Sequence, residues 1–285
     1  MASREDELAM LTAMGFESAQ VRQAFATTGG TLEQVANYLL SGAAAPPAVV
    51  AYGAVDDGQD ASPVRMVHSS MSQYTVAQGK SACTCISLTA AEKFLQRIPA
   101  VAATTTTTPV TSAFLEEIVS SGVAAYQRLQ TSAGLAVEHL SAEEVLNEGG
   151  FPSLALQGGI RQGVLSNSGS NPQGLRQQLL DCQSPNSWTC VLITKTPETV
   201  LVCLPANNRS DSGGDSSFYL LDSHPRPQEF NAAGSYARIH NSIDALASSL
   251  SSIFPVTELG SDIPEMMTIM YNSFDLYPLQ LASSS

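Results

Sequence analysis

The sequence predicts an α+β chain in two parts: a small three-helix bundle, and a larger domain in which helices come first and an antiparallel sheet second. Three patterns lead to this prediction. Residues 5–42 hold three short stretches with apolar residues at helical spacing. Residues 43–69 are rich in Ala, Pro, Gly and Asp and show no sustained period. Residues 70–285 begin with helical patterns and continue with apolar, β-branched runs.

The expected helices of the bundle are separated by glycine-containing breaks. The first covers about residues 5–13 and ends at Met14-Gly15-Phe16, where Gly15 permits a turn that other residues resist. The second ends at Gly29-Gly30. The third opens on a capping box and presents one apolar face made of Leu32, Val35, Ala36 and Leu39.

This segment resembles a UBA domain in its Met14-Gly15-Phe16 loop, its Gly29-Gly30 pair and its terminal Asn37-Tyr38-Leu39-Leu40. The resemblance implies an apolar patch that binds ubiquitin or polyubiquitin chains, made of Met14, Gly15, Phe16, Leu39 and Leu40. Phe16 and Leu39 could instead be simple core residues, and in so small a bundle both roles are compatible.

Residues 43–69 are expected to be a flexible linker between the UBA domain (5–42) and the larger domain (70–285). A tethered binding unit would raise the local concentration of a shared ligand. The larger domain is expected to have helices at 83–98, 111–130, 141–147, 172–182 and 242–254, and strands at 188–194, 200–204 and 217–222. Residues 195–198 are expected to form a hairpin between the first two strands, and Ser141 with Glu144 to cap the 141–147 helix.

Cys83 is a candidate nucleophile because it opens a helix whose first half is almost free of charge. A helix N-terminus favours the thiolate over the thiol. Gln78, five residues earlier, could donate a hydrogen bond to an oxyanion, and Gly79 would let the backbone approach closely. Cys85 is the competing cysteine, but residues two apart on a helix do not share a face. The alternative is that Cys83 is a buried structural cysteine.

Asp222-Ser223-His224 is a candidate acid–base pair. Side chains two apart on a strand project from one face, so Asp222 can reach the His224 ring and fix its tautomer. Metal binding and a simple salt bridge are the alternatives. None of the other histidines (His68, His139 and His240) has an acidic neighbour at this spacing.

Ala82-Cys83-Thr84 at the start of a helix and Leu221-Asp222-Ser223-His224 at the end of a strand together resemble a papain-fold cysteine protease. The acid precedes the histidine by two residues, an order that is similar to the herpesvirus tegument-type deubiquitinases. The resemblance implies a Cys83, His224 and Asp222 triad, with Gln78 or Gln73 as oxyanion donor. Such an enzyme would hydrolyse ubiquitin conjugates. The alternatives are a non-catalytic ubiquitin-binding adaptor and a cysteine protease with another substrate.

Composition and charge argue against several other classes of protein. The net charge of −13 disfavours nucleic-acid binding and suits a partner with a basic face. Five cysteines without a secretory signal predict a reduced, cytoplasmic or nuclear chain. No apolar run approaches the roughly 20 residues of a membrane span, and the cysteine spacing does not fit a zinc site. We therefore expect neither metal nor cofactor.

Overall fold

The computed structural model describes residues 65–102, 109–132, 140–166, 171–207, 217–260 and 263–282, together with Val21, Phe25 and Val35. The chain divides into two compact units, residues 1–60 and residues 61–285. In the first unit the three described residues are helical and buried, as the apolar spacing predicts. The five residues of the predicted ubiquitin-binding patch lie outside the described residues: Met14, Gly15, Phe16, Leu39 and Leu40.

The second unit combines helices with an antiparallel sheet, which is the predicted fold class. Its helices are η1 (Gln73–Thr75), α4 (Cys83–Ala102), α5 (Ser112–Ser132), α6 (Ala142–Asn147), α7 (Leu175–Cys182), α8 (Pro227–Phe230), α9 (Ile243–Ile253) and α10 (Glu265–Asn272). Its strands are β1 (Arg65–His68), β2 (Leu154–Leu156), β3 (Arg161–Val164), β4 (Thr189–Lys195), β5 (Glu198–Leu204), β6 (Phe218–Asp222), β7 (Tyr236–His240) and β8 (Ser273–Leu281).

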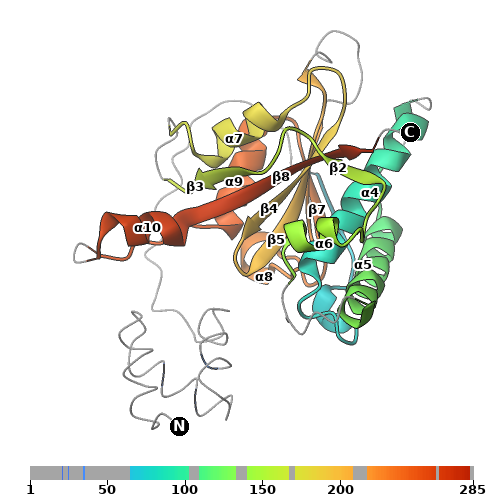
Figure 1. Cartoon of the computed structure of the whole chain (residues 1–285), viewed down its shortest axis with the longest axis horizontal. Helices are drawn as coiled ribbons and strands as arrows, with labels where there is room; N and C mark the ends of the chain where they lie inside the picture. The colour runs from blue at the N-terminus through green and yellow to red at the C-terminus, as the bar shows by residue number, and fades with distance from the viewer. Residues whose placement is uncertain are drawn as a thin grey trace. The chain divides into compact units, whose positions relative to one another are not determined.

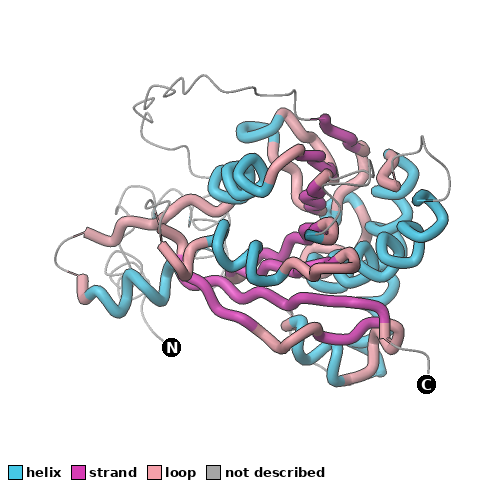
Figure 2. The backbone as a smooth tube through the Cα atoms, turned by 90° about the horizontal axis from the view of Figure 1, so that it is seen from above, coloured by secondary structure: helices cyan, strands magenta, loops and turns pink. Residues whose placement is uncertain are grey.

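The strands form one sheet in the order β1-β7-β6-β5-β4-β8-β2, and β3 also pairs with β8. Every strand pair among the described residues is antiparallel. Helices α4, α5 and α6 cover one face of the sheet, and α7 and α9 cover the other (Figure 1). Figure 2 shows the strands from above, with helices on both sides of them.

The two covered faces explain why the central strands are apolar without interruption. Along β4, Cys190 and Leu192 belong to the core cluster under α4 and α5. Val191 and Ile193, which alternate with them, belong to the cluster under α7 and α9. Successive strand side chains point to opposite faces, so a sheet covered twice needs apolar residues at every position.

Several predicted local features are confirmed. Residues 195–198 join β4 and β5 as a hairpin, with Lys195 opposite Glu198. Ser141 caps α6 through a capping box: its hydroxyl accepts from the Glu144 backbone N–H at 3.2 Å, and its own N–H donates to the Glu144 carboxylate at 2.8 Å. The first half of α4 is buried, as its lack of charge predicts.

Other boundaries differ from the sequence prediction. Residues 65–68, expected in the linker, form β1 and pair with β7 at the edge of the sheet. Helix α4 continues past Pro99 to Ala102, beyond its predicted end at Ile98. Strand β8 was missed because it contains Asp275 and Pro278, which obscure its alternation.

Two glycines bring the segments around the start of α4 into close contact. A Cβ on Gly122 of α5 would lie 2.5 Å from the Ile86 Cα of α4, so the backbones of the two helices approach closely there. A Cβ on Gly79 would lie 2.3 Å from the Gln73 carbonyl oxygen. The close approach at Gly79 is therefore to the backbone of η1.

Candidate active site

Cys83 is the first residue of α4 and is buried, with 4% of its surface exposed. Its sulfur lies 3.9 Å from the Pro197 carbonyl oxygen, in the turn between β4 and β5. The neighbouring Thr84 hydroxyl lies 3.3 Å from the Thr199 hydroxyl on β5. The start of the helix is thus fixed against this hairpin, where the helix N-terminus stabilises negative charge on sulfur.

Asp222 and His224 form the expected pair, by a different local geometry. Strand β6 ends at Asp222, so strand alternation does not align the two side chains. Instead one Asp222 carboxylate oxygen accepts both the His224 backbone N–H at 2.9 Å and a hydrogen bond from the His224 Nδ1 at 2.6 Å. This is an Asx-type turn, which an Asp favours by bonding the backbone two residues on. Because Nδ1 is occupied, Nε2 is the nitrogen left for Cys83.

The second carboxylate oxygen of Asp222 has its own donors, which the sequence analysis did not find. Arg226 Nε donates to it at 3.0 Å and the Tyr236 hydroxyl at 3.1 Å. Arg226 also donates to Glu198 at 2.6 Å, beside the Pro197 turn. The four-residue spacing of Asp222 and Arg226 was the one available signal, since Tyr236 is opposite Asp222 only through the register of β6 and β7.

The electrostatics couple these groups. Burial raises the pKa of Cys83, but the hydrogen bond and charge of His224 outweigh it, so the net pKa is lowered. Burial lowers the pKa of His224, whereas the Asp222 charge and hydrogen bond raise it well above its ordinary value. Burial opposes ionisation of Asp222, but the charges of His224 and Arg226 hold its pKa below its usual range. This arrangement favours a thiolate–imidazolium pair.

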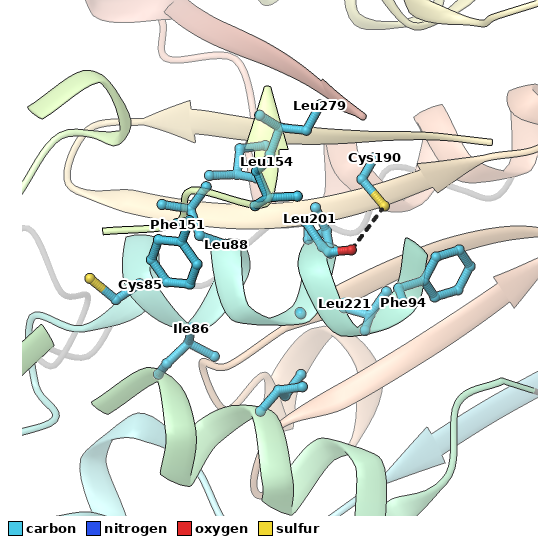
Figure 3. Packing of buried hydrophobic residues seen from close by; sticks show 14 of the residues in the cluster. Cys85, Ile86, Leu88, Phe94, Phe151, Leu154, Cys190, Leu201, Leu221 and Leu279 are labelled. Atoms are coloured by element: carbon cyan, nitrogen blue, oxygen red, sulfur yellow. Dashed lines mark hydrogen bonds between the residues drawn. The ribbon is translucent and has the colours of Figure 1, made fainter. Parts of the chain in front are cut away.

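Cys85 has a different environment. It is fully buried in the apolar cluster under the sheet, where Figure 3 shows it among Ile86, Leu88 and Phe151. Burial raises its pKa to about 12, so it stays a neutral thiol. The two cysteines therefore point to different surroundings, as their two-residue spacing predicts.

The two candidate oxyanion donors also differ. Gln73 is buried and accepts from the Ser223 hydroxyl at 2.7 Å, while its amide nitrogen donates to the Lys80 carbonyl at 2.9 Å. It thus joins the segment before α4 to the residue between Asp222 and His224. Gln78 is exposed and has a positive φ of 62°. The exposed Tyr74 ring packs 6.0 Å from the His224 ring.

The described residues contain no group of three or more His, Cys, Asp or Glu side chains that could hold a metal ion. Among the helices in the described part of the chain, none is long and apolar enough to cross a membrane. All five cysteines are free thiols. Of the other histidines, His68 ends β1 and His240 ends β7, and His139 is not among the described residues.

Comparison with known proteins identifies a family domain and several similar solved structures. The family model for the UBA/TS-N domain matches residues 3–39. No curated protein matches the chain. The fold resembles the ubiquitin-specific protease encoded by murine cytomegalovirus tegument protein M48, solved in complex with a ubiquitin-based suicide substrate. The two chains are 13% identical, with a TM-score of 0.49, over 78% of this chain and 88% of the other.

The Pseudomonas avirulence protein AvrPphB is also similar, at 11% identity and a TM-score of 0.36, over 69% of this chain and 92% of the other. At its N-terminus the chain carries a UBA domain, as the Met14-Gly15-Phe16 loop and the terminal leucines predict.

Proposed function

We propose that this protein is a cysteine-type deubiquitinase that hydrolyses ubiquitin conjugates through Cys83, His224 and Asp222. The observation that carries the proposal is the buried 2.6 Å Asp222–His224 pair next to a cysteine at a helix N-terminus. The UBA domain supports ubiquitin as the substrate, because it supplies a ubiquitin-binding unit on the same chain.

The proposed reaction uses the ion pair from the start. The Cys83 thiolate attacks the carbonyl carbon of ubiquitin's C-terminal glycine and forms a tetrahedral intermediate. As the intermediate collapses, the His224 imidazolium protonates the leaving amine, and a thioester to Cys83 remains. His224 then removes a proton from water, which attacks the thioester and releases ubiquitin and the thiolate. Asp222 holds the ring in one tautomer throughout.

For the oxyanion we propose Gln73 ahead of Gln78. Gln73 is held by Ser223 and Lys80, so its amide group is fixed beside the triad segment. Gln78 is exposed, and nothing described fixes its side chain. Gln73→Glu should therefore reduce turnover by roughly 10²-fold, whereas Gln78→Glu should change it little.

The UBA domain would bind ubiquitin through the Met14-Gly15-Phe16 loop and the Leu39-Leu40 end of its last helix. Met14→Ala with Leu39→Ala should weaken ubiquitin binding by the full-length Cys83→Ala protein, measured by titration calorimetry. The variant's circular dichroism should match that of its parent. Equal affinity in the two folded proteins would remove the patch assignment and leave the triad untouched.

The decisive experiment is labelling with a ubiquitin that carries a C-terminal electrophile. We expect a covalent adduct on Cys83, lost in Cys83→Ser and retained in Cys85→Ser. An unlabelled but folded protein that still binds ubiquitin would be a non-catalytic adaptor. Turnover of a generic fluorogenic peptide but not of ubiquitin–fluorophore would indicate a cysteine protease with another substrate.

A further inference from the structure

Helix α10 presents an unusually apolar surface to solvent. Large apolar side chains are exposed on it and just before it, with Met266 70% and Met270 64% exposed; the others are Ile263, Met267, Ile269 and Tyr271. Of the residues of α10, only Asn272 is fully buried. An exposed patch of this kind marks an interaction surface, and flexible methionines suit it to packing against another apolar surface.

The register of the sheet places α10 at the same end as the candidate active site. Strands β5 and β6 are antiparallel, with Leu201 opposite Leu221. The last residue of β6, Asp222, therefore lies at the end of the sheet where β5 begins. At that same end β4 reaches the Pro197 turn beside Cys83, and its Thr194 pairs with Asp275 of β8. Helix α10 runs directly into β8 there, and Figures 1 and 2 both show it projecting beyond the sheet.

The separation suits a small folded partner. The distance across the sheet from β6 to β8 is three strand spacings, or roughly 15 Å. The eight residues of α10 add about 12 Å of helix. A partner whose flexible tail reaches Cys83 would therefore have its folded body within reach of α10.

The charge around α10 restricts the chemistry of that partner. Glu258 lies in the segment before α10, Glu265 begins the helix and Asp275 follows it in β8, whereas Arg161, opposite Leu276 of β8, is itself paired with Asp181. Glu265 lies exposed in the first turn of α10. The Asn272 side chain bonds both the N–H and the carbonyl of Thr257, at 2.8 and 2.9 Å, which fixes the exposed Glu258 near the other end of the helix.

An apolar surface with an acidic rim fits an apolar patch with a basic rim. A second copy of this chain, net charge −13, would bring acid against acid. The same holds for its own UBA domain, whose residues 3–39 carry five acids and two arginines. An anionic membrane surface would also be repelled.

We infer that α10 is the docking surface for the folded body of ubiquitin while its C-terminal tail enters the site at Cys83. The apolar patch of ubiquitin, bordered by lysines and arginines, has the required chemistry. This inference rests on the proposed function for the choice of ubiquitin. It assigns to the second unit a ubiquitin contact separate from the UBA domain.

The kinetic test uses the full chain with Met14→Ala and Leu39→Ala, so that the UBA domain does not contribute. Met266→Ser with Met270→Ser should lower kcat/KM for ubiquitin–fluorophore roughly tenfold relative to kcat/KM for a fluorogenic peptide of ubiquitin's last five residues. Glu265→Lys should shift this ratio in the same direction. Leu281→Ser, 38% exposed at the far end of β8, is the matched control and should leave the ratio within twofold.

An unchanged ratio in both α10 variants of an enzyme that cleaves ubiquitin would overturn the docking surface but not the proposed function. A direct binding arm separates the two failures. Full-length Cys83→Ala protein in the same UBA background should bind ubiquitin in a titration, and the methionine variant should bind several-fold more weakly. If the enzyme shows no ubiquitin turnover, this loss of affinity still supports the surface. No binding, or a dimer in sedimentation velocity that the methionine variant abolishes, would overturn it.

Discussion

A buried histidine lies at each end of the β6–β7 pair, and the two rings differ in their hydrogen bonds. At one end His224 bonds Asp222, which also accepts from Arg226 and Tyr236. At the other end His240, opposite Phe218, is 2% exposed, and neither ring nitrogen has a hydrogen-bond partner among the described residues.

The pKa values of these two histidines shift in opposite directions. Burial lowers both, but the Asp222 charge more than reverses the effect at His224. At His240 nothing opposes burial, and the Arg238 charge adds to it, so its pKa falls to about 4. Burial alone thus gives a neutral, inert imidazole, whereas burial beside a bonded carboxylate gives a cation suited to proton transfer.

The strongest test of this comparison removes each ring in turn. His224→Ala should reduce ubiquitin–fluorophore turnover by 10²-fold or more, as expected for loss of a general base and acid. His240→Leu should leave turnover within about twofold, because a buried ring without hydrogen bonds can be replaced by an apolar side chain of similar volume. Full activity in a folded His224→Ala protein would remove the protease proposal.

The second test changes the partner instead of the ring. Asp222→Asn should cost roughly 10-fold to 10⁴-fold in kcat, because an amide supports the wrong imidazole tautomer. Adding it to His224→Ala should cost little more, since residues that act as one unit are not additive. Multiplicative losses in the double variant would mean that the two residues act independently.

The third test follows the thiolate. The lowered pKa of Cys83 predicts that its alkylation by iodoacetamide persists to lower pH than that of an ordinary thiol. His224→Ala should move the midpoint of this profile to higher pH, whereas His240→Leu should not move it. Cys85, with its pKa raised to about 12, should remain unmodified across the same range, and peptide mapping by mass spectrometry distinguishes the two cysteines.

How much of this comparison the sequence predicts depends on the range of the interaction. Cys83 at its helix start, and the Asp222–His224 spacing, are local patterns, so the sequence analysis found them. The bond from Tyr236 to Asp222 and the bond from Arg226 to Glu198 depend on strand register and on the position of the hairpin, which no local pattern specifies.

The same limit applies to the fold. The capping box at Ser141 and the 195–198 hairpin are local signals and were predicted. Strand β7 has a mixed apolar and polar sequence and becomes a strand because β6 and β1 pair with its two edges. For this reason β7 was not predicted, and the burial of His240 within the sheet was missed.

The smallest expected effect concerns stability at the His240 end. Its folded pKa of about 4 lies below its ordinary value of 6.5, so between these two pH values the unfolded chain binds a proton that the folded chain does not. His240 therefore does not lower the free energy of unfolding above about pH 6.5. As the pH falls toward 4, its protonation in the unfolded chain lowers that free energy by up to roughly 3 kcal/mol. His224 has the opposite sign, because its raised pKa stabilises the fold at low pH.

The measurement is urea unfolding of the wild type and of His240→Leu from pH 4 to 7.5. We expect the free energies of unfolding to be closest near pH 7 and to diverge in favour of the variant as the pH falls, since leucine has no proton to bind. All other carboxylates and histidines are common to both proteins, so their titration cancels in the difference. A difference that stays constant across the range would show that the His240 imidazole takes up its proton at the same pH in the folded and unfolded states, so that burial does not lower its pKa. The contrast between the two ends of the β6–β7 pair would then be one of degree only.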